Sequence, residues 1–400
     1  MRKHIRIVIV FFPLLLGSVT ASAQSIKDAV EAAWQRSPQG QSAAAWSEEA
    51  QARVNAADRW FAEPPALSIG QRTGRSINNS GARENELEIS LPIRAWNSRA
   101  TDQVLAAAEQ AEWSASLQYA RWRLAGEVRE AYWNTRLAEI ERELALQKAA
   151  SSARIADDAA RRVKAGELAR IDQNRAEAER DAAEIASMEA TIKARQAAQA
   201  FTLLTGLPIG LAIAESANDR AFVWQTHPAY TNQSDAVHVA RARADQAVKV
   251  TRDPLEFTLA TSRERGNMTE PTKSTLRVGI RIPFAADARN KSPIAKATAA
   301  RIEAEAFLPL IEQRLRAEHQ AARDVLSGWQ SLAASADRRV ALARDTAQLI
   351  DKSFRLGETD LPTRLRAENE RFEAERASAR AVIELKRAIS NLNQSSGLLP

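Results

Sequence analysis

The chain has 400 residues, of which 26% are charged and 45% are hydrophobic, and its formal net charge is +6. It contains no cysteine, which excludes disulfides, thiol nucleophiles, thiolate metal sites and a lipid-modified N-terminal cysteine. The basic residues form no stripe of the kind that binds nucleic acid, so no nucleic-acid partner is expected.

Residues 1–23 have the three parts of a secretory signal peptide. The start is basic (Arg2, Lys3, Arg6), an apolar run follows, and positions 21–23 read Ala-Ser-Ala, which suits cleavage. The apolar run is shorter than the ~20 residues of a transmembrane helix. We therefore expect an exported chain, with a mature net charge of about +3 because the leader removes three basic residues.

The first copy of a repeated pattern covers residues 24–208. A helical lead-in at 25–61 precedes a β-hairpin at about 66–93, whose second strand ends in LEISLPI at 87–93. Every second residue of that stretch is apolar, which is typical of a strand with one apolar and one polar face. A proline-free region of strong helix formers follows, and Gly166 predicts a turn that folds it into a long helical hairpin.

The same order of elements returns in residues 234–400. A helix precedes a β-hairpin at about 255–284, which ends in VGIRIPF, and a second helical hairpin turns near Gly357. Matching anchors lie 191 positions apart, among them the two turn glycines. This common offset predicts a tandem repeat, joined by an irregular linker at 209–233.

Four strands in one chain cannot close a membrane barrel, since small barrels have about eight strands and lipid does not tolerate open sheet edges. A trimer would supply a 12-stranded barrel, which is wide enough for a water-filled lumen. The predicted fold class is therefore mainly α with a small β part. Four strands from each chain contribute to a transmembrane β-barrel that a long α-helical barrel continues.

This order of elements resembles the outer-membrane efflux protein family, the TolC-like channels, over the whole mature chain. The turns RRVKAG at 161–166 and SFRLG at 353–357 are similar to the Arg-aromatic-x-x-Gly helical tip of that family. Val163 replaces the aromatic residue in the first turn, and Ser353 replaces the arginine in the second. The stretch IPFAADARNKS at 282–292 is similar to the heavy-metal (CzcC-like) branch, whose channels serve cation-exporting pumps.

The resemblance implies a homotrimer in the outer membrane of a Gram-negative bacterium, extending into the periplasm. It implies a passive exit duct that docks a periplasmic adaptor protein and an inner-membrane efflux pump, with no cofactor. The implied adaptor-docking residues are Arg162, Gly166, Phe354, Arg355 and Gly357. Thr363 and Arg366 stand where the family has constricting carboxylates, so the candidate pore constriction consists of Asp172, Asp360 and Glu368.

The resemblance also assigns the two faces of the strands. The side chains expected to face outer-membrane lipid are Leu87, Ile89, Leu91, Ile93, Val278, Ile280, Ile282 and Phe284. Glu86, Glu88 and Ser90 would face the lumen. Trp60, Phe61 and Trp96 flank the first hairpin, where interfacial aromatic residues are expected.

Other interpretations are open at this stage. The duct could carry drugs and other organic compounds, or a type I secretion substrate, in place of divalent heavy-metal cations. A different class is a periplasmic coiled-coil adaptor or scaffold protein, with the hairpins in a small soluble domain. An enzyme is not expected, because His227, His238 and His319 lack metal-ligand spacing and no nucleophile elbow, phosphate loop or dinucleotide fingerprint is present.

Overall fold

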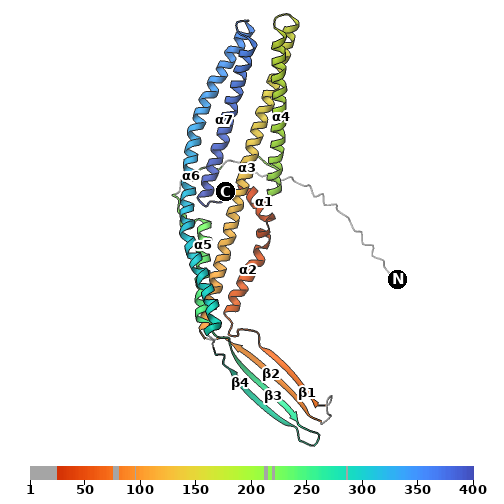
Figure 1. Ribbon diagram of the computed structural model, residues 1–400, viewed down its shortest axis with the longest axis vertical. Coiled ribbons are helices and arrows are strands. Elements are labelled where there is room, and N and C mark those ends of the chain that lie inside the picture. Colours follow the sequence, from red (N-terminus) through yellow and green to blue (C-terminus); the bar gives the residue numbers. More distant parts are fainter. Residues whose placement is uncertain (1–24, 75–80, 95, 211–214, 219–220, 285–286) are drawn as a thin grey trace, which may run out of the picture.

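The computed structural model describes residues 25–74, 81–94, 96–210, 215–218, 221–284 and 287–400. The predicted signal peptide at 1–23 lies outside these residues. The described chain is a long rod with a four-stranded sheet at one end and the turns of two helical hairpins at the other (Figure 1). No helix among the described residues is both long enough and apolar enough to cross a membrane.

The two halves of the chain contain matching elements. The first half gives α1 (Ile26–Arg36), α2 (Pro38–Ala57), β1 (Ala66–Thr73), β2 (Arg83–Ile93), α3 (Trp96–Lys164) and α4 (Arg170–Thr205). The second half gives the 3-10 helix η2 (Trp224–Thr226), α5 (Pro228–Lys249), β3 (Leu255–Arg265), β4 (Lys273–Arg281), α6 (Asp287–Arg355) and α7 (Leu361–Ser395). Helices α3 and α6 each have 69 residues, and α6 begins 191 positions after α3, which is the offset of the predicted repeat.

The lead-in that the sequence pattern predicts as one helix is two helices with a break at Ser37. The Ser37 hydroxyl accepts a hydrogen bond from the Gly40 N–H at 2.9 Å and so caps α2. Pro38 occupies the first position of α2, where a missing N–H costs nothing. The same proline cannot continue α1, because its ring would clash with the preceding turn.

Helix α5 begins inside the predicted linker. Pro228 is its first residue, and the Nδ1 atom of His227 accepts a hydrogen bond from the Ala229 N–H at 3.1 Å. The His227 ring is 1% exposed, and burial lowers its pKa to about 4. The ring is therefore neutral at neutral pH, which is the state that can accept this capping bond.

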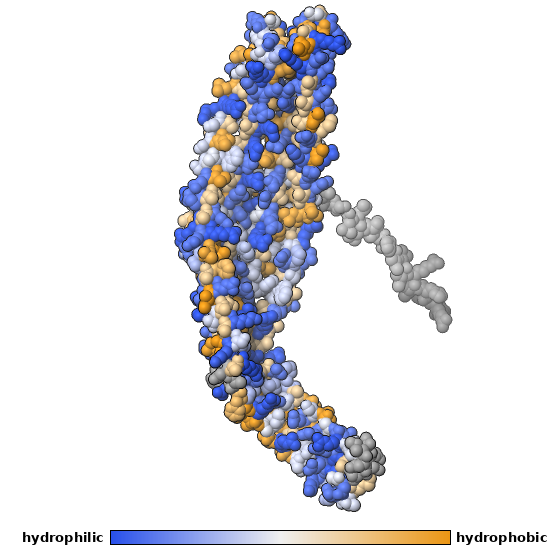
Figure 2. Space-filling model, viewed as in Figure 1, coloured by the Kyte–Doolittle hydropathy of each residue, from blue (hydrophilic) through white to orange (hydrophobic). Residues whose placement is uncertain are grey.

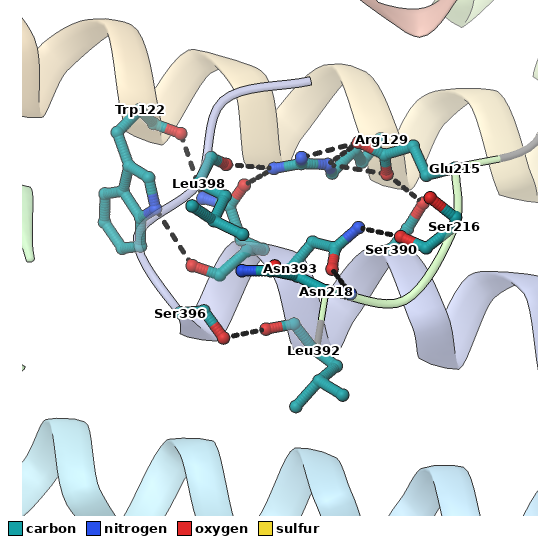
Figure 3. Close-up of polar contacts among 11 residues, drawn as sticks. Trp122, Arg129, Glu215, Ser216, Asn218, Ser390, Leu392, Asn393, Ser396 and Leu398 are labelled. Atoms are coloured by element: carbon teal, nitrogen blue, oxygen red, sulfur yellow. Dashed lines mark hydrogen bonds and ion pairs between the residues drawn. The ribbon is translucent and has the colours of Figure 1, made fainter. Parts of the chain in front are cut away.

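A buried polar cluster anchors the described part of the linker (Figure 3). The guanidinium of Arg129 on α3 is 1% exposed and pairs with the carboxylate of Glu215 at 2.7 Å. Ser390 on α7 donates a hydrogen bond to the same carboxylate, and the Asn393 amide donates to the Ser216 carbonyl at 2.9 Å. The cluster thereby joins α3, the linker and the end of α7, and so connects the two repeats.

The rod has a small apolar interior. Among the described residues there are two buried apolar clusters. The larger packs α1 against the middle of α3 and the end of α4, and it consists of Ile26, Ala29, Val30, Ala33, Ala125, Val128, Tyr132, Trp133 and Phe201. Elsewhere many of the buried positions are alanines, such as Ala183, Ala381 and Ala388, which allow close contact between helices. Much apolar surface is left outside, and Figure 2 shows hydrophobic residues along the whole visible length of the rod.

Candidate functional site

The four strands form one antiparallel sheet in the order β1-β2-β3-β4, so β1 and β4 are its edges. Strands β2 and β3, which come from different repeats, pair with Leu87 opposite Thr261 and Ile89 opposite Leu259. Directly opposite residues of an antiparallel pair point to the same face. The register therefore sorts the side chains of all four strands onto two faces.

One face carries every large apolar side chain of the sheet. Its members are Leu67, Ile69, Leu87, Ile89, Leu91, Ile93, Leu255, Phe257, Leu259, Leu276, Val278 and Ile280. Ten of these twelve side chains are exposed, from 37% for Ile93 to 78% for Ile69, and Leu91 and Phe257 are half-buried. Strand β4 ends at Arg281, so Ile282 and Phe284 lie beyond the strand in which the pattern placed them. Pro283 has no N–H with which to continue the ladder.

The opposite face is polar, and its positions on the two central strands are more enclosed. Ala260 and Ser262 on this face are 2% and 7% exposed, whereas Leu259 on the apolar face is 39% exposed. The arginines of the polar face pair with carboxylates of the same face, namely Arg72 with Glu84 at 3.3 Å, Arg277 with Glu86 at 3.2 Å and Arg281 with Glu256 at 3.4 Å. On the central strands β2 and β3, most polar positions are thus more enclosed than the apolar positions beside them, which is the reverse of a sheet built for water.

Aromatic residues lie where the sheet meets the helices. Trp60 is 58% exposed and lies under the guanidinium of Arg99, 4.5 Å from the ring centroid. Phe61 is 41% exposed and forms an isolated β-bridge with Ile93. The side chain of Trp96 lies outside the described part of the chain.

The turns at the far end of the rod have the same geometry. Gly166 and Gly357 both have φ of +79°, a left-handed conformation that favours glycine. The N–H of the residue after each glycine donates to the carbonyl five residues back, at 2.9 Å in the first turn and 3.0 Å in the second. This is the Schellman arrangement that ends many helices. The two tips are therefore structural copies of one another.

An aromatic side chain joins the two tips. Phe354 is 3% exposed and lies between the guanidiniums of Arg162 and Arg364, each 4.8 Å from its ring centroid. Arg364 on α7 also pairs with Asp158 on α3 at 3.4 Å and with Asp351 on α6 at 2.8 Å. Phe354, a predicted docking residue, is thus enclosed within the tips rather than presented on their surface.

The other predicted docking residues are more accessible. Gly166, Arg355 and Gly357 are exposed, and a side chain at either glycine would meet only open space. Arg162 is 26% exposed and pairs with Asp158 at 3.4 Å. The free surface of the tips is therefore formed by the turns themselves.

The three candidate constriction residues differ in their surroundings. Asp172 lies in the first turn of α4. Asp360 caps α7, and the hydrogen bond that it accepts from the Thr363 side chain, together with the one from the Thr363 backbone N–H at 3.0 Å, lowers its pKa. Burial raises the pKa of Glu368, but hydrogen bonds from Arg371 at 2.7 Å and Ser151 at 2.6 Å outweigh it and hold this pKa below its ordinary value.

No shared acidic cluster results from these residues. In the ranges that the structure describes, no three His, Asp or Glu side chains are arranged to hold a metal ion.

The lateral edges of the rod carry apolar seams. In the half of the rod that ends in the helical turns, the helices lie in the order α4-α3-α7-α6, so α4 and α6 are outermost. Exposed residues recur on α4 at Ile171, Ile185 and Ile192, which are 59%, 59% and 55% exposed. They recur on α6 at Leu342 and Leu349, which are 71% and 60% exposed, and Leu356 in the turn directly after α6 is 66% exposed. Spacings of seven residues and its multiples put each set on one face of its helix, as in a helix-pairing seam.

Comparison with known proteins gives structural matches only. No family model and no curated protein matches the sequence. The chain superimposes on CusC with a TM-score of 0.76 at 15% identity, covering 94% of this chain and 93% of CusC. VceC of Vibrio cholerae gives 0.75 at 15% identity, covering 93% and 96%. MtrE of Neisseria gonorrhoeae gives 0.76 at 16% identity, covering 94% and 89%.

CusC is described in connection with transmembrane channel formation, VceC as an outer membrane protein, and MtrE as an outer membrane channel in its open state. The chain has the fold of the outer-membrane channels. The predicted fold class is thereby confirmed, from the four-stranded sheet to the long helical hairpins.

Sequence reasoning missed the residues that join the tips in this outer-membrane channel fold. Asp158, Asp351 and Arg364 come from three helices, and their spacing in the chain gives no sign that they meet. The contacts of Arg129 with Glu215 and Ser390 were missed for the same reason. Arg129 lies in a helix that is rich in charged residues, so the sequence alone does not distinguish this buried arginine from the exposed ones.

Proposed function

We propose that this chain is one protomer of a trimeric outer-membrane exit duct of a tripartite efflux system in a Gram-negative bacterium. The observation that carries the proposal is the exposed apolar face of the sheet, opposite a polar face. Burying one Leu or Ile side chain stabilises a structure by roughly 1.5–3 kcal/mol, so this face needs an apolar environment. Lipid supplies that environment, provided that the strand edges are paired.

The two lateral edges support closure into a ring. Strand β1 and helix α4 lie on one side of the protomer, and strand β4 and helix α6 lie on the other (Figure 1). In a ring, β1 of one copy pairs with β4 of the next, and the seams of α4 and α6 meet. Two copies would give a barrel of about eight strands, which its own side chains fill, so three copies are the smallest set with an open lumen.

The tips, at the opposite end from the sheet, are the proposed contact with a periplasmic adaptor and, through it, an inner-membrane pump. Gly166, Arg355 and Gly357 offer the accessible surface, while Arg162 and Phe354 hold its shape. Asp172, Asp360 and Glu368 remain the proposed constriction. The pairing of Glu368 with Arg371 means that any acidic ring depends chiefly on the first two.

The proposed cargo is a divalent heavy-metal cation, on the similarity of residues 282–292 to the heavy-metal branch, of which 285–286 lie outside the described residues. Metal tolerance of a deletion strain tests this point. Unchanged tolerance to zinc, cobalt, cadmium, nickel, copper and silver would contradict it. Sensitivity to organic toxins in the same strain would favour the alternative cargo.

Membrane fractionation followed by native mass measurement in detergent tests the duct itself. The proposal expects the mature chain in the outer-membrane fraction, as a particle of three copies that conducts ions in a planar bilayer. Release of the chain by osmotic shock as a water-soluble protein would favour the periplasmic adaptor or scaffold instead.

A further inference from the structure

Three arginines continue the apolar face of the sheet toward its hairpin turns. Arg83 on β2 lies directly opposite Arg265 on β3, and Arg263 lies opposite Asn85. All three stand an even number of residues from Leu87 or Leu259, so they point to the apolar face. The apolar band is therefore bordered, at the end away from the helices, by a group of positive charges.

These arginines differ from those on the opposite face. In the described part of the chain, none of the three has a carboxylate within ion-pair distance, whereas Arg72, Arg277 and Arg281 on the polar face are all paired. Arg265 donates one hydrogen bond, to the Gly81 carbonyl at 3.4 Å, and its buried Nε has no partner among the described residues. Like charges directly across a strand pair are destabilising, so this arrangement favours a bound anion.

We propose that Arg83, Arg263 and Arg265 bind the phosphate groups of outer-leaflet lipid headgroups. This rests on the proposed function, which turns the apolar face to lipid and places the hairpin turns on the side of the membrane away from the helices. The arginines then lie where the hydrocarbon ends and the headgroups begin. A guanidinium offers a planar fork of donors that matches phosphate oxygens, and desolvated arginine is well suited to this contact.

The apolar band decides between a lipid phosphate and a free phosphate ion. A lipid would place its acyl chains along the exposed side chains of Leu87, Leu259 and Leu276 while its phosphates reach the arginines. A free ion would gain only the charge contacts. The site therefore belongs to a phosphorylated lipid, and it would fix the depth of the barrel in the membrane.

The test uses the full-length chain purified as an assembly in neutral detergent. Diphosphorylated lipid A, the same lipid without phosphates, and inorganic phosphate are titrated while the thermal midpoint is followed. For the unmodified chain, only the diphosphorylated lipid should raise the midpoint. Removing the arginines as R83Q, R263Q and R265Q should weaken apparent affinity about fivefold for each change and about a hundredfold together.

The matched control removes the same number of charges from the polar face, as R72Q, R277Q and R281Q, and should keep the affinity of the unmodified chain. The variant R83K/R263K/R265K keeps the charge and should retain most binding, which guards against a fold defect in the glutamine variant. Equal affinity of the two glutamine triples would overturn the lipid site, and so would an equal response to inorganic phosphate. In both cases the assembly would still form, whereas failure of the proposed function would appear earlier, as the absence of a membrane-inserted trimer.

Discussion

At the scale of single residues, the stability of the rod depends on a few buried polar groups, because the rod has only a small apolar core. Arg129 is fully enclosed, and its partners are the linker carboxylate of Glu215 and groups at the end of α7 (Figure 3). A buried ion pair is costly to form but more costly to break from one side, because the remaining charge is left without a partner. The connection between the two repeats is therefore sensitive to this one side chain.

The substitution Arg129→Ala should lower the free energy of unfolding by about 3–5 kcal/mol, the range found when one partner of a buried pair is removed. Arg136→Ala is the matched control, since Arg136 lies on the same helix in a partly exposed pair with Glu139 at 2.6 Å. That pair should contribute about 0–1 kcal/mol. Denaturant unfolding in detergent measures both, and equal losses would show that burial of Arg129 is not what matters.

His227 gives a pH dependence with a definite sign. Its pKa is about 4 in the folded chain, against an ordinary value of 6.5, because the ring is buried. As pH falls from 6.5 toward 4, the unfolded chain takes up a proton that the folded chain does not. Stability present above pH 6.5 is therefore lost on acidification, by about 3 kcal/mol in total from this group.

The variant His227→Asn isolates this effect, because an asparagine oxygen can still cap α5 but does not titrate. Thermal midpoints measured between pH 7.5 and 4 should fall more steeply for the unmodified chain than for the variant. Parallel curves would show that His227 does not control the acid sensitivity.

At the scale of elements, the alternation along each strand assigns every side chain to one of the two faces of the sheet. The register between strands then shows which residues share a face across all four strands. Ile89 on the apolar face is 39% exposed, and Glu88 beside it points to the enclosed polar face. In the proposed barrel the first meets lipid and the second meets the lumen.

The substitution Ile89→Arg should therefore impair membrane assembly, since an arginine facing lipid near the midplane costs roughly 2–4 kcal/mol. Glu88→Gln changes a neighbouring residue on the other face and should assemble normally. The amount of assembled protein in the outer-membrane fraction measures both variants. Equal effects from the two changes would mean that the assignment of faces is wrong.

The sequence was sufficient to predict most of the elements, but not how they meet. Alternation predicted β2 to its last residue, Ile93, and Gly166 and Gly357 predicted both helical turns, because these signals are local. The same alternation overran β4, where Pro283 ends the ladder. The pairing of β2 with β3 and the link from Arg364 to Asp158 depend on the alignment of distant segments, which no local pattern encodes.

Helix periodicity has the same limit: it predicts a packing face but not the helix that packs against it. On α6, apolar or small residues recur from Leu315 to Ala336 at spacings typical of a packed helix interface, yet Val325 and Leu332 within this stretch are 49% and 48% exposed. Periodicity identifies a helix face that is suited to packing against another helix. It does not show whether that second helix belongs to the same chain. In the proposed trimer these residues lie on the outermost helix, available to a neighbouring copy.

At the scale of the whole molecule, a single chain is an open layer with two lateral edges. Its sheet has two edges, its helical layer has two apolar seams, and the order of elements places one edge of each kind on each side. Repetition of the chain around an axis satisfies both edges with the same contact, since the left edge of one copy meets the right edge of the next. Closure into a ring is therefore the property that the assembly requires of every copy.

Cross-linking of the two sheet edges tests closure most directly, and the absence of native cysteine makes the chain suitable. Ile69→Cys on β1 would be combined in turn with Ser274→Cys, Leu276→Cys, Val278→Cys or Ile280→Cys on β4, and intact cells would be treated with a short bis-maleimide. A closed trimer should give, for at least one combination, a ladder of linked chains that ends at three. Absence of cross-links in every combination, or a ladder that ends at two or extends beyond three, would contradict it.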